Sequence, residues 1–347
     1  MRAVVLDGVR SVSVTDVADP VLPGDDGVVV QVEQAGICGS DLHLYHGDLG
    51  EPGTRLGHEF VGTVLEAGPA VRTVRPGDRV LVSGVIGCGH CPPCLARDPA
   101  RCRNGGTAVF GTGADLPGGQ AEAVAVPAAD AWTLVVPEDV TPTQAVLLTD
   151  ILPTGYLGAR RADIVPGSTV AVIGLGPVGV LALECARLFG PARLLAVDQV
   201  PDRLARAERL GAETVDASAG PVPEQLMALT GGHGVDAVIE AVGADRTVSD
   251  ALLSVATGGT VSVVGVSVNM AFPFPLVLAL LRGLTFRVTL ASIPSTWDTL
   301  VPLLATGRLA PDDVVTHRLG LSEAPEAYAM FDAHAEGVLK VVLDPTR

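Results

Sequence analysis

Lysine is almost missing from this sequence. Lys340 is the only lysine among 23 basic residues, and the others are arginine. Schiff-base enzymes need an amine that can lose its proton, and arginine stays protonated in proteins, so the sequence nearly excludes that chemistry. Aromatic residues are also scarce at 3%, and the net charge is −16. A basic groove lined with stacking rings is therefore not expected, and neither is a nucleic-acid partner.

Long apolar runs are missing as well, although 48% of the residues are hydrophobic. Proline, glycine or a charged residue interrupts every run, and the longest, Met270–Leu281, contains two prolines and is too short to cross a bilayer. The N-terminal residues M-R-A-V-V-L-D-G lack the long apolar core of a signal peptide. We expect a soluble, cytoplasmic protein with no membrane partner.

At 347 residues the chain is long for one hydrophobic core, so two domains are expected. Up to about residue 137, short valine-rich runs alternate with glycine and proline, which is typical of a β-rich, barrel-like unit. From Val140 to about Ser292, apolar strands alternate with helical stretches, the pattern of a parallel sheet with crossover helices. The remaining residues predict a helix over Trp297–Thr306 and a strand over Val338–Leu343.

Four of the six cysteines fall within one stretch rich in glycine and proline, at Cys88, Cys91, Cys94 and Cys102. Four thiolates with this spacing, C-x2-C-x2-C-x7-C, can surround one Zn²⁺ tetrahedrally, and such a closed site stiffens a loop without doing chemistry. An iron–sulfur cluster is the minor alternative, because its ligands can be similarly spaced. Free buried thiols are the alternative without a metal. We expect a structural zinc.

A second candidate metal site lies in the stretch Ile37–Glu59. It holds a thiol at Cys38 and an imidazole at His58, both of them ligands that Zn²⁺ prefers. Ser40 and His43 follow the cysteine, and a hydroxyl and an imidazole beside an open metal position can carry a proton. Buried cysteines and histidines more often have structural roles, so this stretch alone is a weak indication.

A dinucleotide fingerprint follows a strand-like run at residues 168–173. The run S-T-V-A-V-I leads into G-L-G-P-V-G and then into a helical stretch that reaches Phe189. In G-x-G-x-x-G turns of this kind, the N-terminus of the helix receives the pyrophosphate. We assign cofactor contacts to the turn residues Gly174, Gly176, Pro177, Val178 and Gly179.

The identity of the cofactor depends on Asp198, which ends the next strand-like run. A carboxylate there accepts hydrogen bonds from the ribose hydroxyls and repels a 2′-phosphate, so NAD is favoured over NADP. Arg203 lies nearby on the following helix. It either softens that preference or only flanks the adenine.

With these parts in place, the chain resembles the zinc-dependent medium-chain alcohol dehydrogenases over essentially its whole length. That family's signature, G-H-E-x2-G-x5-G-x2-V, is matched position by position by Gly57, His58, Glu59, Gly62, Gly68 and Val71. The resemblance implies an α/β protein with a GroES-like β-barrel catalytic domain in two segments, residues 1–150 and 290–347. Residues 151–289 would form a Rossmann domain, a doubly wound parallel sheet that binds NAD.

Carried over residue by residue, the resemblance implies that Cys38 and His58 are ligands of a catalytic zinc. Many members use a second cysteine as third ligand, and here the matching residue is Asp150. Its segment, T-D-I-L-P-T-G-Y, resembles the formaldehyde-dehydrogenase-like branch, in which an aspartate ligates the metal. The alternative role for Asp150 is a helix N-cap.

The same resemblance implies roles for several residues around the metal. Ser40 and His43 match the positions of a proton relay, and Glu59 would be an outer or alternate zinc ligand. Thr154 would pack on the nicotinamide. Lys340 lies where the family often has a basic residue near the pyrophosphate, and its alternative is a solvated lysine at a strand end.

The activity implied is reversible hydride transfer between NAD and a small alcohol, or its aldehyde or ketone, with two zinc ions per chain and the alkoxide on the catalytic zinc. A polyol or formaldehyde-type dehydrogenase is the alternative within the family. A zinc-free quinone reductase or a non-catalytic relative fits the intact ligand set less well. Leu284–Leu290 reads as an edge strand, and its pairing between subunits would give a homodimer or homotetramer.

Overall fold

The computed structural model describes residues 1–288 and 290–347. The chain forms two compact units, one made of Met1–Pro153 with Ala291–Arg347 and the other of Thr154–Leu290. These limits lie close to the boundaries predicted at residues 150 and 290. In the described part of the chain, no helix combines the length and the apolar character that crossing a bilayer requires.

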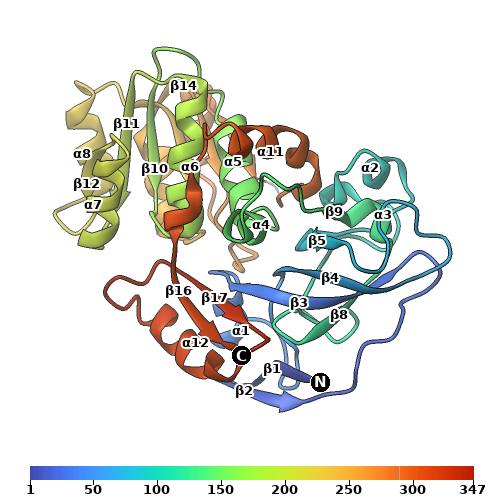
Figure 1. Cartoon of the computed structure of the whole chain (residues 1–347). Helices are drawn as coiled ribbons and strands as arrows, with labels where there is room; N and C mark the ends of the chain where they lie inside the picture. The colour runs from blue at the N-terminus through green and yellow to red at the C-terminus, as the bar shows by residue number, and fades with distance from the viewer. Residues whose placement is uncertain (289) are drawn as a thin grey trace. The chain divides into compact units, whose positions relative to one another are not determined.

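The first unit is built mainly from antiparallel strands. Its largest sheet has the strand order β16-β17-β3-β4-β5-β9, and β8 also pairs with β3 (Figure 1). The strands of this sheet are β3 (Val28–Ile37), β4 (Glu59–Ala67), β5 (Arg79–Val82), β8 (Ala123–Val126), β9 (Thr133–Val135), β16 (Val315–Gly320) and β17 (Lys340–Asp344). Two smaller sheets pair β1 (Arg2–Gly8) with β2 (Ser11–Asp16) and β6 (Val85–Ile86) with β7 (Ala108–Val109).

Short helices connect and cover these strands. They are α1 (Asp41–Tyr45), α2 (Pro92–Leu95), α3 (Ala129–Trp132), α4 (Pro142–Leu147), α11 (Trp297–Ala305) and α12 (Ala324–Asp332), with 3₁₀ turns η1 (Pro99–Arg101), η3 (Ile293–Thr296), η4 (Pro311–Val314) and η5 (Leu321–Glu323). Alternate residues of the strands enter a core that contains Val30, Val32 and Phe60. A second core lies under α12 and contains Tyr328 and Leu343.

The second unit is a parallel sheet with the strand order β12-β11-β10-β13-β14-β15. Its strands are β10 (Thr169–Ile173), β11 (Arg193–Asp198), β12 (Glu213–Asp216), β13 (Val235–Glu240), β14 (Val255–Val263) and β15 (Thr285–Val288). From β10 the chain adds strands first toward one edge and then toward the other. This is the predicted doubly wound arrangement, and the Rossmann fold is confirmed.

Among the described residues, six helices pack on this sheet, and all except α5 connect two of its strands. They are α5 (Ile151–Arg161), which continues from the first unit, α6 (Pro177–Ala186) followed by η2 (Arg187–Phe189), α7 (Pro201–Arg209), α8 (Val222–Leu229), α9 (Asp245–Ser254) and α10 (Leu276–Arg282). Leu226 of α8 and Leu252 of α9 share a core with Ala171 and Leu195 of the sheet. On α5, Gly158 lies close to Ile239 and Val264.

Two strands differ in their limits from the prediction. β17 begins at Lys340, because the N–H of Val338 donates to Ala335 in the preceding turn. The predicted edge strand is confirmed as β15, while its residue 289 lies outside the described residues.

Candidate metal centres and cofactor loop

Strand pairing brings Cys38 and His58 together at one edge of the main sheet. Cys38 directly follows β3, and His58 directly precedes β4. The two strands are antiparallel and Gly36 pairs with Glu59, so the end of β3 lies beside the start of β4. The two predicted ligands are neighbours for that reason.

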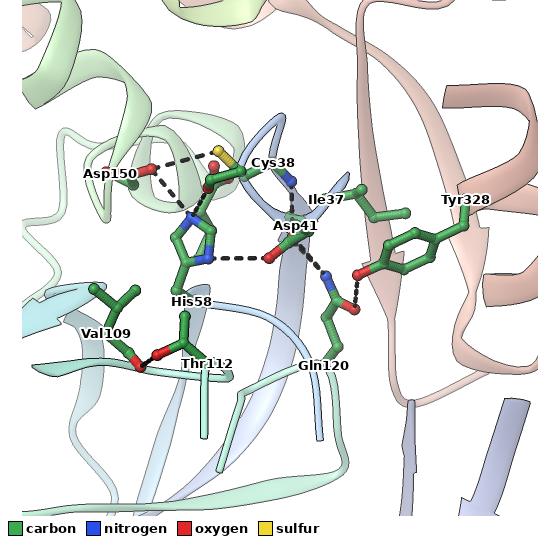
Figure 2. Close-up of polar contacts among 12 residues, drawn as sticks. Ile37, Cys38, Asp41, His58, Val109, Thr112, Gln120, Asp150 and Tyr328 are labelled. Carbon is green, nitrogen blue, oxygen red and sulfur yellow. Dashed lines mark hydrogen bonds and ion pairs between the residues drawn. The ribbon is translucent and has the colours of Figure 1, made fainter. Parts of the chain in front are cut away.

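Asp150, which directly precedes α5, completes this group. Its Oδ2 lies 3.3 Å from His58 Nε2 and 3.6 Å from Cys38 Sγ. Figure 2 shows these three side chains pointing toward one another. Together with Glu59 they offer four ligand atoms that all lie within 4.8 Å of one another. We call these four residues the Cys38 group. Asp150 stands where a helix cap would stand, but its carboxylate faces the thiol and the imidazole.

The chemistry of the Cys38 group suits a zinc ion. It gathers one thiol, one imidazole and two carboxylates, and Cys38, His58 and Glu59 are buried. Burial raises the pKa of the Cys38 thiol. Burial alone would lower the pKa of His58, but the nearby charges of Asp41 and Cys38 raise it well above its usual value. Within the described residues, Glu59 Oε1 has no hydrogen-bond partner. A cation would displace the protons and offset the cost of burying these donors together.

Asp41 is a site residue that the sequence patterns did not indicate. Its buried carboxylate places Oδ1 3.1 Å from His58 Nδ1, and its Oδ2 accepts a hydrogen bond from the N–H of Cys38 at 2.9 Å. When His58 donates from Nδ1, its Nε2 keeps a lone pair for a metal. The sequence did not indicate this role, because an aspartate at the start of a helix such as α1 is usually explained by its favourable interaction with the helix dipole.

Lys340 is not the solvated lysine at a strand end that was one expectation, and its contact with a pyrophosphate stays a prediction. Its side chain is fully buried, and its Nζ lies 2.5 Å from Glu59 Oε2 and donates to the carbonyl of Ile37 at 2.8 Å. Pairing of Val341 with Ile37 between β17 and β3 brings the lysine there. Burial alone would lower the pKa of Lys340, but the charge of Glu59 raises it. An ammonium enclosed in this way is not solvated.

The predicted relay residues, Ser40 and His43, lie in the segment that follows Cys38. Ser40 Oγ is 3.3 Å from His58 Nε2, which puts the hydroxyl beside the Cys38 group. His43 lies on α1 with a quarter of its side chain exposed, and its Nδ1 is 3.3 Å from Asp48 Oδ2. One residue is therefore next to the group and the other reaches the surface. Their role in proton transfer stays a prediction.

The four-cysteine lobe, residues 88–102, brings its sulfur atoms together. All four Sγ atoms lie within 4.8 Å of one another, with 3.4 Å between Cys91 and Cys94 and 3.9 Å between Cys88 and Cys94. Four sulfurs at about 2.3 Å from a zinc ion would stand about 3.8 Å apart, whereas a disulfide requires about 2.05 Å. The N–H of Arg103 donates to Cys91 Sγ, and it is the main cause that lowers the pKa of this thiol to about 6.

In the second unit, the glycine-rich turn has the geometry that a dinucleotide needs. Gly176 caps α6 from an extended conformation, and a Cβ built there would have no atom within 4 Å, so the space above the turn is open. At Gly179 a Cβ would lie 1.8 Å from the carbonyl oxygen of Gly174, so only glycine allows the helix to pack this closely. The first turn of α6, from Pro177 and Val178 onward, presents its N-terminus to that space.

Asp198 ends β11 next to this turn. Its Oδ2 accepts a hydrogen bond from the N–H of Leu175 at 2.7 Å, and its Oδ1 accepts from the N–H groups of Gln199 and Val200 at 2.8 and 2.9 Å. Arg203 Nη1 lies 3.8 Å from Asp198 Oδ2. The carboxylate is thus fixed beside the glycine-rich turn. The contacts of Asp198, Arg203 and Thr154 with a cofactor stay predictions.

Comparison with known proteins agrees with both units. The family profile described as alcohol dehydrogenase GroES-like domain matches residues 24–138, and the profile described as zinc-binding dehydrogenase matches residues 177–306. A protein of Mycobacterium tuberculosis named a probable zinc-binding alcohol dehydrogenase is 52% identical, over 99% of this chain and 89% of its own length.

Solved structures show the same relation. An alcohol dehydrogenase from Thermus sp. ATN1 superposes with a TM-score of 0.91 and 42% identity, covering 99% of both chains. A zinc-binding dehydrogenase from Sinorhizobium meliloti, bound to NADP, has a TM-score of 0.84 and 34% identity, again covering 99% of both chains. Identity at this level over nearly the whole length shows the family. The chain belongs to the zinc-dependent medium-chain alcohol dehydrogenases, which are oxidoreductases.

Proposed function

We propose that the protein transfers a hydride reversibly between a small alcohol and NAD, using a zinc ion held by Cys38, His58 and Asp150. The observation that carries this proposal is that the three ligand atoms lie close together at one edge of the sheet, while Asp41 contacts the other ring nitrogen of His58. Cys38 and Asp150 together can supply two negative charges, which balance Zn²⁺. When bound, zinc supplies a Lewis acid that lowers the pKa of a substrate hydroxyl or polarises a carbonyl.

The residues around the group would manage the substrate's proton. Ser40 is near enough to the Cys38 group to accept that proton, and His43 is exposed enough to pass it on to water. Asp41 keeps His58 as the tautomer whose Nε2 faces the ligands. A second zinc in the four-cysteine lobe would stiffen the loop and take no part in the reaction.

NAD is the cofactor that we propose, on the strength of Asp198. Its negative charge beside the glycine-rich turn favours ribose hydroxyls over a 2′-phosphate. Arg203 near Asp198 would reduce this preference without reversing it. The NADP bound to the Sinorhizobium meliloti relative makes the preference worth measuring directly.

The test is spectrophotometric. Purified protein is incubated with NAD or NADP and a panel of primary alcohols, secondary alcohols, polyols and formaldehyde, and the appearance of reduced nicotinamide is followed before and after treatment with a chelator. We expect turnover with NAD that chelation abolishes and added zinc restores. Turnover that is insensitive to chelation would favour a zinc-free reductase and would disprove the metal assignment.

Within the family, a formaldehyde-type dehydrogenase is the second candidate. It is favoured by Asp150, because an aspartate replaces the commoner cysteine as third ligand. An oxygen donor is harder than a thiolate and should make the metal more electrophilic and more exchangeable. Formaldehyde outperforming every alcohol in the panel would support this reading.

We also propose that the chain forms a homodimer or homotetramer. β15 is an edge strand of the second unit, and α10, which precedes it, exposes Leu276, Val277, Leu280 and Leu281. Leu281 keeps 78% of its surface exposed, which is unusual for a leucine. Twofold pairing of this edge with a second copy would cover it. Light scattering should give at least twice the monomer mass, and a strict monomer at micromolar concentration would disprove the proposal.

A further inference from the structure

Tyr328 lies far from the Cys38 group along the chain but is connected to it by hydrogen bonds. It is fully buried on α12, and its hydroxyl donates to Gln120 Oε1 at 2.8 Å. Gln120, also fully buried, donates from Nε2 to Asp41 Oδ2 at 3.3 Å and to the carbonyl of Gly36 at 3.0 Å. Asp41 Oδ1 in turn lies 3.1 Å from His58 Nδ1. Figure 2 shows this series of contacts running from Tyr328 to the imidazole.

The donors and acceptors in this series fit together in one direction. The hydroxyl of Tyr328 donates to the amide oxygen of Gln120, so the amide nitrogen faces Asp41. Burial raises the pKa of Tyr328 well above its usual value, which keeps its proton in place. Asp41 accepts from Gln120 and from Cys38, and its remaining oxygen accepts from His58 Nδ1. The lone pair of the imidazole is then on Nε2, the nitrogen that faces the other ligands.

The backbone beside His58 also depends on this glutamine. Gly57 has a φ of +97°, and a Cβ there would lie only 2.3 Å from Cγ of Gln120. Gln120 therefore packs directly on the residue that precedes the imidazole. The backbone N–H of Gln120 donates to Leu56 at 3.0 Å, which fixes the two segments relative to each other. A rotation of the Gln120 side chain would disturb Asp41 and Gly57 together.

We propose that Tyr328 is a positioning residue for the catalytic metal, which acts through Gln120 and Asp41 to hold His58 in the rotamer and tautomer that ligate zinc. The inference rests on the proposed function, because it requires that the Cys38 group binds the metal. Tyr328 itself is not one of the four residues of the Cys38 group. Outer partners of metal ligands typically change metal affinity by about 10–100-fold, and Tyr328 lies two hydrogen bonds behind Asp41, so we expect about tenfold.

The test compares zinc release in Tyr328→Phe and in wild-type protein. Protein loaded with zinc is mixed with a coloured chelator, and release is followed in time. We expect two phases, a fast one from the Cys38 group and a slow one from the four-cysteine lobe. In Tyr328→Phe the fast phase should accelerate about tenfold while the slow phase is unchanged. The visible spectrum of Co²⁺ bound in place of the faster-released zinc should change as well, because it reports ligand geometry.

The matched control is Tyr45→Phe. The ring centroid of Tyr45 lies 5.4 Å from that of Tyr328 in the same core. Tyr45 is not a member of the series of hydrogen bonds that runs from Tyr328 to His58. This variant should release zinc as the wild type does. If both variants accelerate release equally, or if both phases accelerate together, the hydroxyl of Tyr328 has only a general packing role and the inference is wrong.

A double variant tests whether the residues act in series. Gln120→Leu should accelerate the fast phase at least as much as Tyr328→Phe, and adding Tyr328→Phe to it should have no further effect. Fully additive effects would overturn the inference. Wild-type protein that binds a single zinc, in the four-cysteine lobe, would instead overturn the proposed function. The two failures are therefore distinguishable.

Discussion

The two candidate metal centres are built in opposite ways. The four-cysteine lobe takes every ligand from residues 88–102, and the backbone N–H of the next residue, Arg103, donates to Cys91 Sγ. The Cys38 group takes its ligands from the end of β3, the start of β4 and the residue before α5. Two charged residues outside this group contact its members: Asp41 contacts His58, and Lys340 contacts Glu59. One loop is enough to bring the ligands of the lobe together, whereas the ligands of the Cys38 group meet only when distant segments of the first unit have folded.

This difference sets how each centre should respond to damage. A site closed by four thiolates offers no position to a competing ligand, while a site with an oxygen ligand and an open position exchanges its metal more readily. Limited chelation should remove the metal of the Cys38 group first. The following predictions, from the largest expected effect to the smallest, test whether the two centres are independent.

Asp150→Ala should have the largest effect. Without the third ligand the Cys38 group should lose its zinc, and turnover should fall below detection. The lobe should keep its zinc, and the free energy of unfolding should change little. Metal analysis and activity assays on the same sample check this result. Loss of both metals would show that the centres are coupled.

Two further substitutions at this position separate a ligand from a helix cap. Asp150→Cys restores the commoner ligand at the same charge and should keep zinc and some activity. Asp150→Asn can still cap a helix but is a poor zinc ligand, so it should lose the metal. If Asp150→Asn kept full zinc and turnover, Asp150 would be a cap, and Glu59 would be the first candidate for the third ligand.

Lys340→Met should strongly destabilise the first unit. It leaves the carboxylate of Glu59 buried without its partner, and breaking a buried ion pair in this way costs about 3–5 kcal/mol. Urea unfolding followed by circular dichroism measures the change. Lys340→Arg keeps the charge and should recover part of it. A Lys340→Met protein of normal stability would mean that Glu59 is protonated or is held by the metal alone.

Cys94→Ser should separate stability from chemistry. The variant should lose the zinc of the lobe and about 0.5–3 kcal/mol of stability, because a structural metal contributes to the stability of the fold that binds it. At low temperature it should still turn over substrate, since the Cys38 group takes no ligand from the lobe. A variant that is stable but inactive would contradict the assignment of the lobe as structural.

Asp198→Ala should have the smallest effect, and it lies in the other unit. Removing the carboxylate should narrow the preference for NAD by about tenfold, as expected for losing one charge-assisted hydrogen bond. Asp198→Asn is the matched control, because it keeps an acceptor for Leu175 and removes only the charge. Both variants should retain both zinc ions. Wild-type protein that prefers NADP would disprove the cofactor assignment.

The sequence was most informative where the partners are close along the chain. The lobe could be predicted from its cysteine spacing, and the cofactor turn from three glycines within one strand–turn–helix unit. The partners of Asp41 and Lys340 could not be predicted, because each depends on strand register. Only the pairing of β17 with β3 and of β3 with β4 brings Lys340 to Glu59. A solvated lysine was the ordinary expectation, since lysine is almost never fully buried unless it is paired.

The burial of Lys340 also determines how the protein surface reacts with carbonyl compounds. Aldehydes condense with the ε-amine of lysine, whereas the guanidinium of arginine remains protonated and is a poor nucleophile. The single lysine of this chain is fully enclosed and held by Glu59. While the protein is folded, an aldehyde formed in the proposed reaction therefore meets no lysine amine on the surface. Unfolding would expose the only one.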